Sequence, residues 1–268
     1  MSNSIYFNQS DSRWAKHPYT STSHPKATVS SGGCGPTCAA MVVSNLKETV
    51  YPDRMADLFK RNNLRGASGT LNKAFDWIAN KWQLQCSKTV YIQNAVDCLK
   101  RGGIVVALCH KNKYNLISTG GHFVVLAGLT GLLKDTLIIY DPSLSKNKYT
   151  YNSLRKKVAR VEGNKVLISV KNFKKYCDYD LWCYEPLSKY KPGEMVVMNA
   201  EVGIAYVQGA ETLVQCGDQQ FWVHSDEVHG NRLISNVTIC FAQGTSYIVQ
   251  YWDQQFWIKE KDIEKKVK

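Results

Sequence analysis

A glycine-rich stretch that leads into a single cysteine, residues 30–43 (SSGGCGPTCAAMVV), constrains the fold more than any other part of this chain. Its glycines allow backbone angles that other residues avoid and a close approach of backbone to a substrate. Pro36 suits the first turn of a helix, and the apolar run around it predicts a helix over residues 35–46. The sulfur of Cys34 would then lie beside the helix N-terminus, where the partial positive charge favours the thiolate. The stretch therefore predicts a nucleophilic cysteine.

Two polar residues downstream, His122 and Asp141, are candidates for the base and the orienting group that such a nucleophile needs. His122 opens a strand-like apolar run, and Asp141 closes the next such run. Neighbouring strands would bring both side chains to one end of a sheet, facing the helix that carries Cys34. Gln9, close to the N-terminus, supplies a neutral amide donor suited to an oxyanion hole.

These residues occur in an order that resembles the papain-like cysteine peptidases, and more closely the branch related to the peptidases that remove double-glycine leaders. The motifs that carry the resemblance span residues 5–142: NQxDxxW at 8–14, GCGPT at 33–37, GT at 69–70, GGHF at 120–123 and YDP at 140–142. The resemblance implies that Cys34 is the nucleophile and His122 the general base. It also implies that Asp141 orients His122 and that Gln9 stabilises the oxyanion.

The order of the periodic runs predicts an α+β domain over residues 1–187, with helices packed on an antiparallel sheet that follows them in the chain. The papain-like resemblance implies the same architecture. Besides the helix at 35–46, helices are expected at 52–61, 70–82 (capped by Thr70) and 93–100, and strands at 88–92, 104–109, 122–129 and 136–140.

A sequence repeat occupies the C-terminal part, where residues 208–223 recur as residues 243–258, 35 positions later. Each copy alternates apolar and polar residues, turns at an Asp-Gln pair and resumes as a strand, which predicts a hairpin. Residues 188–268 are therefore expected to form an all-β domain, in which the two copies build either one unit or two. They resemble the SH3-like small β-barrels appended to bacterial wall hydrolases, and this resemblance implies cell-wall binding.

Four further residues are candidates for substrate contact: Trp14, Gly33, Gly121 and Trp252. In a papain-like arrangement the N-terminal segment lines the cleft, where Trp14 would either border the groove or, as we expect, be buried. Trp222 and Trp257 hold equivalent positions in the two repeats and are expected to be core residues rather than exposed platforms. Trp252 has no tryptophan counterpart in the first copy and is the better candidate for a surface contact.

The nine cysteines are irregularly spaced and include no Cys-x-x-Cys pair, which argues against a zinc site or a disulfide framework. Free thiols in a chain made in a reducing compartment are the simpler interpretation. Cys38, one helical turn after Cys34, is expected to be a small buried residue rather than a metal ligand or a resolving partner. The predicted thiol chemistry needs no metal and no organic cofactor.

The net charge of +12 is unevenly spread, because residues 143–192 hold twelve Lys and Arg against four Asp and Glu. Such a surplus either steers a protein to an anionic polymer, such as a cell wall, a membrane surface or nucleic acid, or is merely a solvated face. No nucleic-acid motif accompanies it, so no nucleic-acid partner is expected. No apolar run reaches the roughly 18 residues of a membrane span, so no transmembrane segment is predicted.

These features lead to three hypotheses. The first is a peptidoglycan hydrolase similar to a phage endolysin or a plasmid-borne wall-opening enzyme, acting as a stem-peptide endopeptidase or, alternatively, as an amidase. No Sec signal peptide is visible, so we expect synthesis in the cytoplasm and action on the wall after release, or as an extracellular enzyme. The rivals are a protein- or leader-processing cysteine peptidase and a non-catalytic wall-binding module. The bond cut, the host and the oligomeric state stay open at this point.

Overall fold

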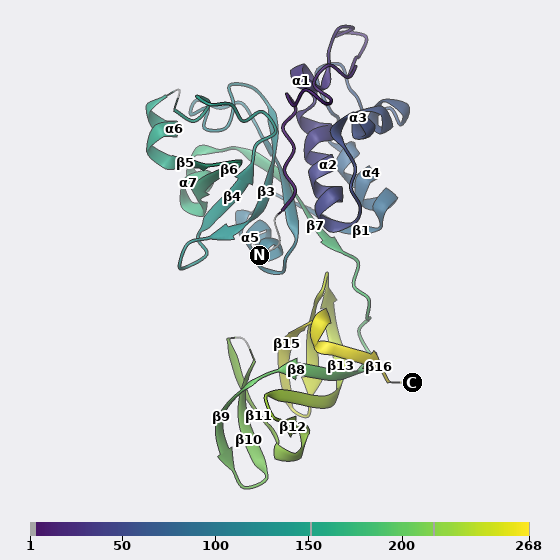
Figure 1. Cartoon of the computed structure of the whole chain (residues 1–268), viewed down its shortest axis with the longest axis vertical. Helices are drawn as coiled ribbons and strands as arrows, with labels where there is room; N and C mark the ends of the chain where they lie inside the picture. The colour runs from purple at the N-terminus through teal and green to yellow at the C-terminus, as the bar shows by residue number, and fades with distance from the viewer. Residues whose placement is uncertain (1–3, 151, 217, 268) are drawn as a thin grey trace. The chain divides into compact units, whose positions relative to one another are not determined.

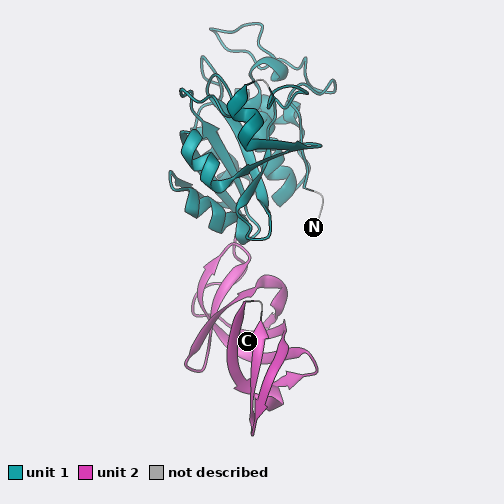
Figure 2. Ribbon diagram, turned by 90° about the vertical axis from the view of Figure 1, so that its left-hand side faces the viewer, with its two compact units in different colours: residues 1–186 teal, residues 187–268 magenta. Residues whose placement is uncertain are grey.

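The computed structural model describes residues 4–150, 152–216 and 218–267. The chain divides into two compact units, residues 1–186 (unit 1) and residues 187–268 (unit 2), coloured separately in Figure 2. This division falls one residue before the boundary expected from the sequence. Among the described residues, no helix is both long enough and apolar enough to cross a membrane.

The helices of unit 1 form two groups that pack against different faces of its sheet (Figure 1). Helix α2 begins at Cys34 itself, one residue earlier than predicted, and its residues from Gly35 to Val43 are all buried. The helices described in unit 1 are α1 (Val29–Gly32), α2 (Cys34–Leu46), α3 (Pro52–Arg61), α4 (Lys73–Trp82), α5 (Ile92–Lys100), α6 (Ser153–Val158) and α7 (Val170–Tyr176).

The sheet of unit 1 is antiparallel throughout, with the strand order β1-β7-β2-β3-β4-β6-β5. Its strands are β1 (Leu84–Thr89), β2 (Ile104–Cys109), β3 (His122–Thr130), β4 (Thr136–Tyr140), β5 (Ala159–Glu162), β6 (Lys165–Ser169) and β7 (Tyr179–Pro186). Strands β3 and β4 are direct neighbours, with Val125 opposite Tyr140. The start of β3 and the end of β4 therefore lie at the same end of the sheet, as the sequence predicts for His122 and Asp141.

Alternation along the central strands explains why both faces of the sheet are covered. Val106 and Val125 contribute to the hydrophobic cluster shared with α2 to α4, whereas Val105 and Val124 contribute to the cluster shared with α5 and α7. Successive side chains of a strand point to opposite faces, so a strand that is apolar at every position must be buried on both sides. The near-continuous apolar runs of β2 and β3 match this requirement.

Two predicted elements are displaced in the structure. Helix α4 begins at Lys73 behind the N-cap Asn72, and the hydroxyl of Thr70, the expected cap, instead hydrogen-bonds to the phenol of Tyr19 at 2.7 Å. The strand expected at 88–92 lies earlier, as β1, because Gln83 adopts a left-handed conformation with φ of 51° that ends the helix and turns the chain directly into the strand.

Unit 2 consists of β-strands with two short 3-10 helices, η1 (Ser225–Glu227) and η2 (Glu260–Asp262). One sheet has the order β11-β10-β9 and the other the order β15-β14-β13-β8-β16, with β12 paired to β13. The strands are β8 (Met195–Glu201), β9 (Gly203–Gln208), β10 (Glu211–Cys216), β11 (Gln219–His224), β12 (Val228–His229), β13 (Arg232–Gln243), β14 (Ser246–Tyr251), β15 (Gln254–Lys259) and β16 (Ile263–Lys266). The two predicted hairpins are β10–β11 and β14–β15.

The two repeats form one packed unit rather than two. Strand β12, which follows the first repeat, pairs with β13, which leads into the second, and β16, which follows the second, pairs with β8 ahead of the first. The equivalent rings of Phe221 and Phe256 stack on each other with centroids 3.9 Å apart in one shared hydrophobic core. Neither repeat could bury its apolar face without the other, which explains why each copy is so short.

The prediction of core tryptophans in the repeats is wrong. Phe221 and Phe256 are 6% and 3% exposed and occupy the core positions, whereas Trp222 is half-buried and Trp257 is 39% exposed. Because neighbouring residues of a strand face opposite sides, placing the phenylalanine inward turns the following tryptophan outward. Trp252 lies in the turn between β14 and β15 and is 69% exposed.

Candidate active site

The nucleophile candidate Cys34 is the first residue of α2, where the local packing leaves no room for side chains on two neighbouring glycines. A Cβ on Gly33 would come within 2.5 Å of the Val29 carbonyl oxygen, and one on Gly35 would come within 2.1 Å of Thr70 Oγ1. These close approaches hold the first turn of α2 against the preceding helix and against the loop before α4. The glycine-rich stretch therefore fixes the position of the cysteine.

His122 and Asp141 meet as the sequence predicts. His122 Nε2 lies 2.8 Å from Asp141 Oδ1, and both side chains are buried. The thiol of Cys34 also hydrogen-bonds to the His122 ring. Since Nε2 is engaged by the carboxylate, Nδ1 is the ring nitrogen that faces the sulfur. This order, thiol to imidazole to carboxylate, is the arrangement of a nucleophile, its base and the group that orients the base.

The electrostatics favour a thiolate–imidazolium pair. Burial raises the pKa of Cys34, but the hydrogen bond and charge of His122, with the backbone N–H groups of Phe123 and Gly35, outweigh it, so the pKa lies below its ordinary value. Burial lowers the pKa of His122, but the opposing effects of Asp141 and Cys34 are larger and raise that pKa to about 9. Burial opposes ionisation of Asp141 as well, yet His122 and Lys148 hold its pKa far below the ordinary range.

Gln9, the candidate oxyanion donor, lies in the wall of the same cavity as Cys34. It lines a cavity of about 430 Å³ together with Cys34, His122 and Gly121. Its backbone N–H donates to the Pro142 carbonyl at 2.7 Å and its Nε2 donates to the Ser30 carbonyl at 2.6 Å. An amide nitrogen carries two hydrogens, so the second N–H remains available for a substrate oxygen. In Figure 1 this N-terminal segment, in dark purple, runs between β3 and α2.

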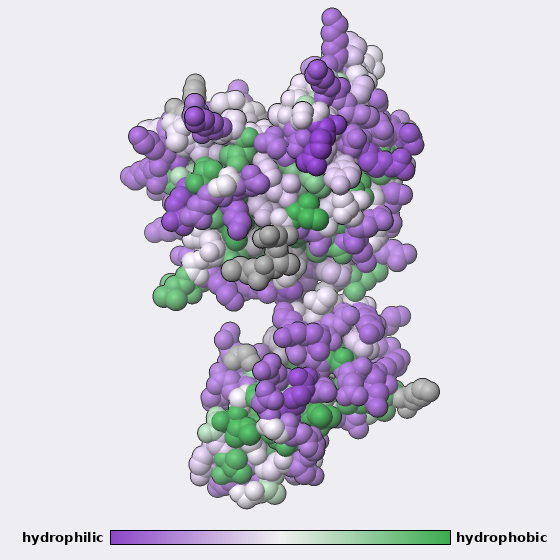
Figure 3. Space-filling model, viewed as in Figure 1, coloured by the Kyte–Doolittle hydropathy of each residue, from purple (hydrophilic) through white to green (hydrophobic). Residues whose placement is uncertain are grey.

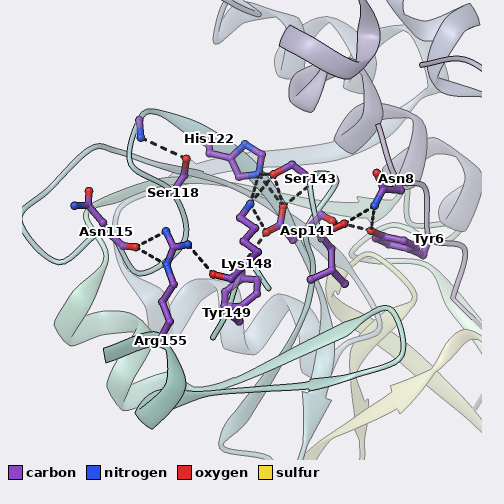
Figure 4. A network of polar contacts seen from close by, with 12 residues as sticks. Tyr6, Asn8, Asn115, Ser118, His122, Asp141, Ser143, Lys148, Tyr149 and Arg155 are labelled. Carbon is purple, nitrogen blue, oxygen red and sulfur yellow. Dashed lines mark hydrogen bonds and ion pairs between the residues drawn. The ribbon is translucent and has the colours of Figure 1, made fainter. Parts of the chain in front are cut away.

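The carboxylate of Asp141 has several partners that the sequence analysis missed (Figure 4). Its Oδ2 accepts a hydrogen bond from the Tyr149 hydroxyl at 2.8 Å and lies 2.6 Å from Lys148 Nζ. Its Oδ1 accepts from the Ser143 backbone N–H at 2.9 Å. All three partners follow Asp141 closely in the loop after β4, and this run of polar residues behind a buried carboxylate is the signal that could have identified them.

Two of the four candidates for substrate contact do not line the cavity, and Trp14 is buried as expected. Trp14 is 3% exposed, its indole N–H donates to the Asn8 carbonyl at 2.8 Å, and its ring stacks on Tyr51, so it anchors the N-terminal segment instead. Gly33 is absent from the cavity wall and serves the packing described above. Gly121 does line the cavity, and Trp252 belongs to unit 2.

Cys38 lies one turn after Cys34 but faces the core. Its side chain is fully buried, and burial together with the nearby Cys34 and Asp141 raises its pKa well above that of an ordinary thiol. It therefore stays protonated at neutral pH and is not a second nucleophile. Among the described residues, no three His, Cys, Asp or Glu side chains gather in a way that could hold a metal ion.

Comparison with known families identifies the catalytic unit. The profile of the Peptidase_C39 like family matches residues 2–164, which include all four predicted catalytic residues. The chain belongs to this family of cysteine peptidases. Within this C39-like peptidase, Cys34 is the candidate nucleophile and His122 the candidate general base.

Searches beyond the family profile gave weaker likenesses. No curated protein matches this C39-like peptidase. The peptidase domain of Streptococcus ComA, a bifunctional ABC transporter involved in quorum sensing, is 17% identical, with a TM-score of 0.39, over 57% of this chain and 91% of that one. A protein from Bacillus anthracis described as a C39-like peptidase is 14% identical, with a TM-score of 0.43, over 70% of this chain and 98% of that one.

Proposed function

We propose that this C39-like cysteine peptidase is a peptidoglycan hydrolase that cleaves an amide bond of the bacterial cell wall, preferentially within the stem peptide. The observation that carries the proposal is the pairing of a complete thiol site in unit 1 with a separate all-β unit that exposes aromatic rings. The thiolate of Cys34 attacks the amide carbonyl, Gln9 and the Cys34 backbone N–H hold the oxyanion, and His122 protonates the leaving amine. Water then hydrolyses the thioester.

A cationic groove beside the catalytic cavity supports a substrate that carries carboxylates, as stem peptides do. A second cavity of about 490 Å³ shares Ser31, Gly32 and Ser68 with the first, and its wall includes Arg65 and Lys26. Arg65 Nε donates to the Tyr19 carbonyl at 3.1 Å and Nη1 to the Gly66 carbonyl at 2.6 Å. The guanidinium is therefore held in place with its charge at the groove, and a fixed guanidinium is well suited to bind a carboxylate.

The surface of unit 2 supports attachment to a polymer. All six residues of β9 are exposed, Tyr206 among them at 58%, and hydrophobic residues gather over this part of unit 2 in Figure 3. Trp252 packs against His224 with ring centroids 4.6 Å apart while remaining mostly exposed. Exposed apolar and aromatic surface of this extent marks an interaction site more often than an idle surface. We propose that it binds the wall, with anionic wall polymers attracted by the net charge of +12.

The decisive experiment is digestion of purified Gram-positive peptidoglycan by the wild type and by Cys34→Ala, with mass spectrometry of the released fragments. New thiol-dependent amino termini within the stem peptide identify an endopeptidase, and a free lactyl carboxyl on the sugar identifies an amidase. No release from the wall, combined with thiol-dependent cleavage of an unstructured polypeptide, would contradict the proposal in favour of a protein- or leader-processing peptidase. Wall binding without any thiol-dependent cleavage would indicate a non-catalytic binding protein.

A further inference from the structure

A buried lysine shares the carboxylate that orients the catalytic histidine (Figure 4). Lys148 Nζ lies 2.6 Å from Asp141 Oδ2 and 3.5 Å from His122 Nε2, and its side chain is only 12% exposed. Nζ also donates a hydrogen bond at 2.5 Å to the hydroxyl of Ser143, which itself donates to Asp141 Oδ1 at 3.2 Å. The ammonium group therefore contacts the carboxylate directly and through Ser143. Ser143 lines the substrate cavity, whereas Lys148 does not.

The turn that carries Lys148 is anchored, so its position is not that of a mobile surface lysine. Arg155 is 5% exposed, and its Nη1 donates to the Lys148 carbonyl at 2.8 Å. The same guanidinium donates twice to the Asn115 carbonyl, at 2.8 and 2.6 Å, which ties the turn to the loop before His122. The backbone N–H of Arg155 donates to the side chain of Asn152, which is the N-cap of α6.

The charges around Asp141 balance in pairs. A Cys34 thiolate faces the His122 imidazolium, and the Asp141 carboxylate faces the Lys148 ammonium. The other titratable neighbours stay neutral at physiological pH. Burial raises the pKa values of Tyr6, Cys38 and Tyr149, and a hydrogen bond with Cys177, together with burial, raises that of Cys109. Arg155 is a more distant cation behind the ring of Tyr149. Without Lys148, the carboxylate would act on His122 alone and hold its proton more tightly.

We propose that Lys148 is a positioning residue that divides the charge of Asp141 between itself and His122. It keeps Oδ1 turned toward Nε2, and it keeps the imidazolium acidic enough to release its Nδ1 proton to the leaving amine. The proton moves from His122 to the amine nitrogen as the carbon–nitrogen bond breaks. The Lys148 ammonium lies 3.5 Å from the His122 ring and repels the imidazolium charge. Removing that ammonium therefore stabilises the protonated forms of Cys34 and His122 and raises both apparent pKa values.

The test uses alkylation of Cys34 by iodoacetamide across pH, which requires no knowledge of the substrate. The extent of reaction is read on the Cys34 peptide by mass spectrometry, with Cys34→Ser as the blank. In the wild type the upper apparent pKa, which reports loss of the imidazolium proton, is expected near 9. In Lys148→Gln, which keeps a donor but loses the charge, we expect both apparent pKa values to rise, the upper by about one unit. Lys148→Arg, which keeps the charge, should stay close to the wild type.

The outcomes separate positioning from a structural role. An unchanged upper pKa in a folded Lys148→Gln protein overturns the proposal, even if activity falls. Asp141→Asn provides a second route if that variant does not fold, because it leaves Lys148 unpaired beside His122. Burial alone lowers this pKa, so Asp141→Asn is compared with Asp141→Asn/Lys148→Gln. The upper pKa should be about one unit higher in the double variant, whereas equal values in the two proteins contradict an influence of Lys148. With any cleaved peptide, Lys148→Gln should lower kcat and leave KM unchanged.

Discussion

The two units bury different kinds of polar side chain. Unit 1 buries charged side chains, whereas the described residues of unit 2 bury hydroxyl groups, including the phenols of its tyrosines, and no charged side chain. The polar side chains concerned are Gln9, Thr37, His122, Asp141, Arg155 and Glu185 in unit 1, and Thr212, Ser235 and Ser246 in unit 2. A buried charge is costly unless it is paired, whereas a hydroxyl needs a single partner.

This difference indicates where each unit does its work. Most buried charges of unit 1 are paired: His122 and Lys148 with Asp141, and Arg101 with Glu185 at 2.7 Å. The guanidinium of Arg155 instead donates to backbone carbonyls. His122, Lys148 and Asp141 lie next to the candidate nucleophile, where the exclusion of water strengthens the electrostatic interactions that catalysis requires. Unit 2 instead places its distinctive side chains, the aromatic rings, at the surface. Substitutions in the interior of unit 1 should therefore change chemistry, and substitutions on the surface of unit 2 should change binding alone.

The largest expected effect is that of Asp141→Asn, which keeps the size of the side chain but removes the charge that holds His122 protonated. We expect kcat to fall by about two to four orders of magnitude, as for the loss of general acid–base catalysis, with KM nearly unchanged. Steady-state kinetics on any cleaved peptide measures this. Thr212→Ala, which removes a buried hydroxyl of unit 2 bonded to Ser225, is the matched control and should leave kcat unchanged. Similar losses for both variants would contradict the contrast between the units.

The same carboxylate makes the stability of unit 1 depend on pH in the acid range. The pKa of Asp141 is far lower in the folded protein than the value of about 3.9 in an unfolded chain. Its contribution is therefore fully present above pH 4 and is lost as the pH falls below that value. Thermal unfolding should show the unit 1 transition falling by a few degrees more in the wild type than in Asp141→Asn between pH 5 and pH 3. Identical shifts in the two proteins would contradict a strong stabilisation of the carboxylate.

The sequence predicted the parts of the fold whose signals are local. Helix α2 and strands β2, β3 and β4 follow from apolar periodicity, and the meeting of His122 with Asp141 follows from two neighbouring strands. The polar run after β4 offers candidates for the partners of Asp141, but it does not show which of them reach the carboxylate. The loop has no periodicity, and its shape depends on Arg155 contacting Asn115 across forty residues of sequence. The tryptophans of the repeats were misassigned because alternation gives two faces but does not say which one is inward.

A smaller effect is expected from Arg65→Gln at the cationic groove beside the catalytic cavity. A pair of peptides that differ only in one carboxylate, free or amidated, tests the groove directly. We expect KM for the free acid to rise about tenfold, the size of a lost charge-assisted hydrogen bond, and KM for the amide to stay the same. Lys26→Gln, which removes a neighbouring exposed charge, should change less. An equal rise for both peptides would mean that Arg65 supports the loop rather than binding a carboxylate.

The smallest expected effect separates the two units most cleanly. Trp252→Ala removes a ring from the turn between β14 and β15, where it is 69% exposed and lies outside the core cluster of unit 2, touching it only at Tyr251. The loss of one aromatic contact should weaken sedimentation with purified cell walls by about five-fold, since such contacts contribute about 1 kcal/mol. Cleavage of a soluble peptide should not change, because that reaction needs only the cavity of unit 1. Tyr91→Ala, at a residue of unit 1 that is 70% exposed, is the matched control for the loss of a surface ring. If Tyr91→Ala weakens sedimentation as much as Trp252→Ala does, wall attachment does not depend on the Trp252 surface. Binding must then be assigned to the positive charge of the chain, and added salt should abolish it.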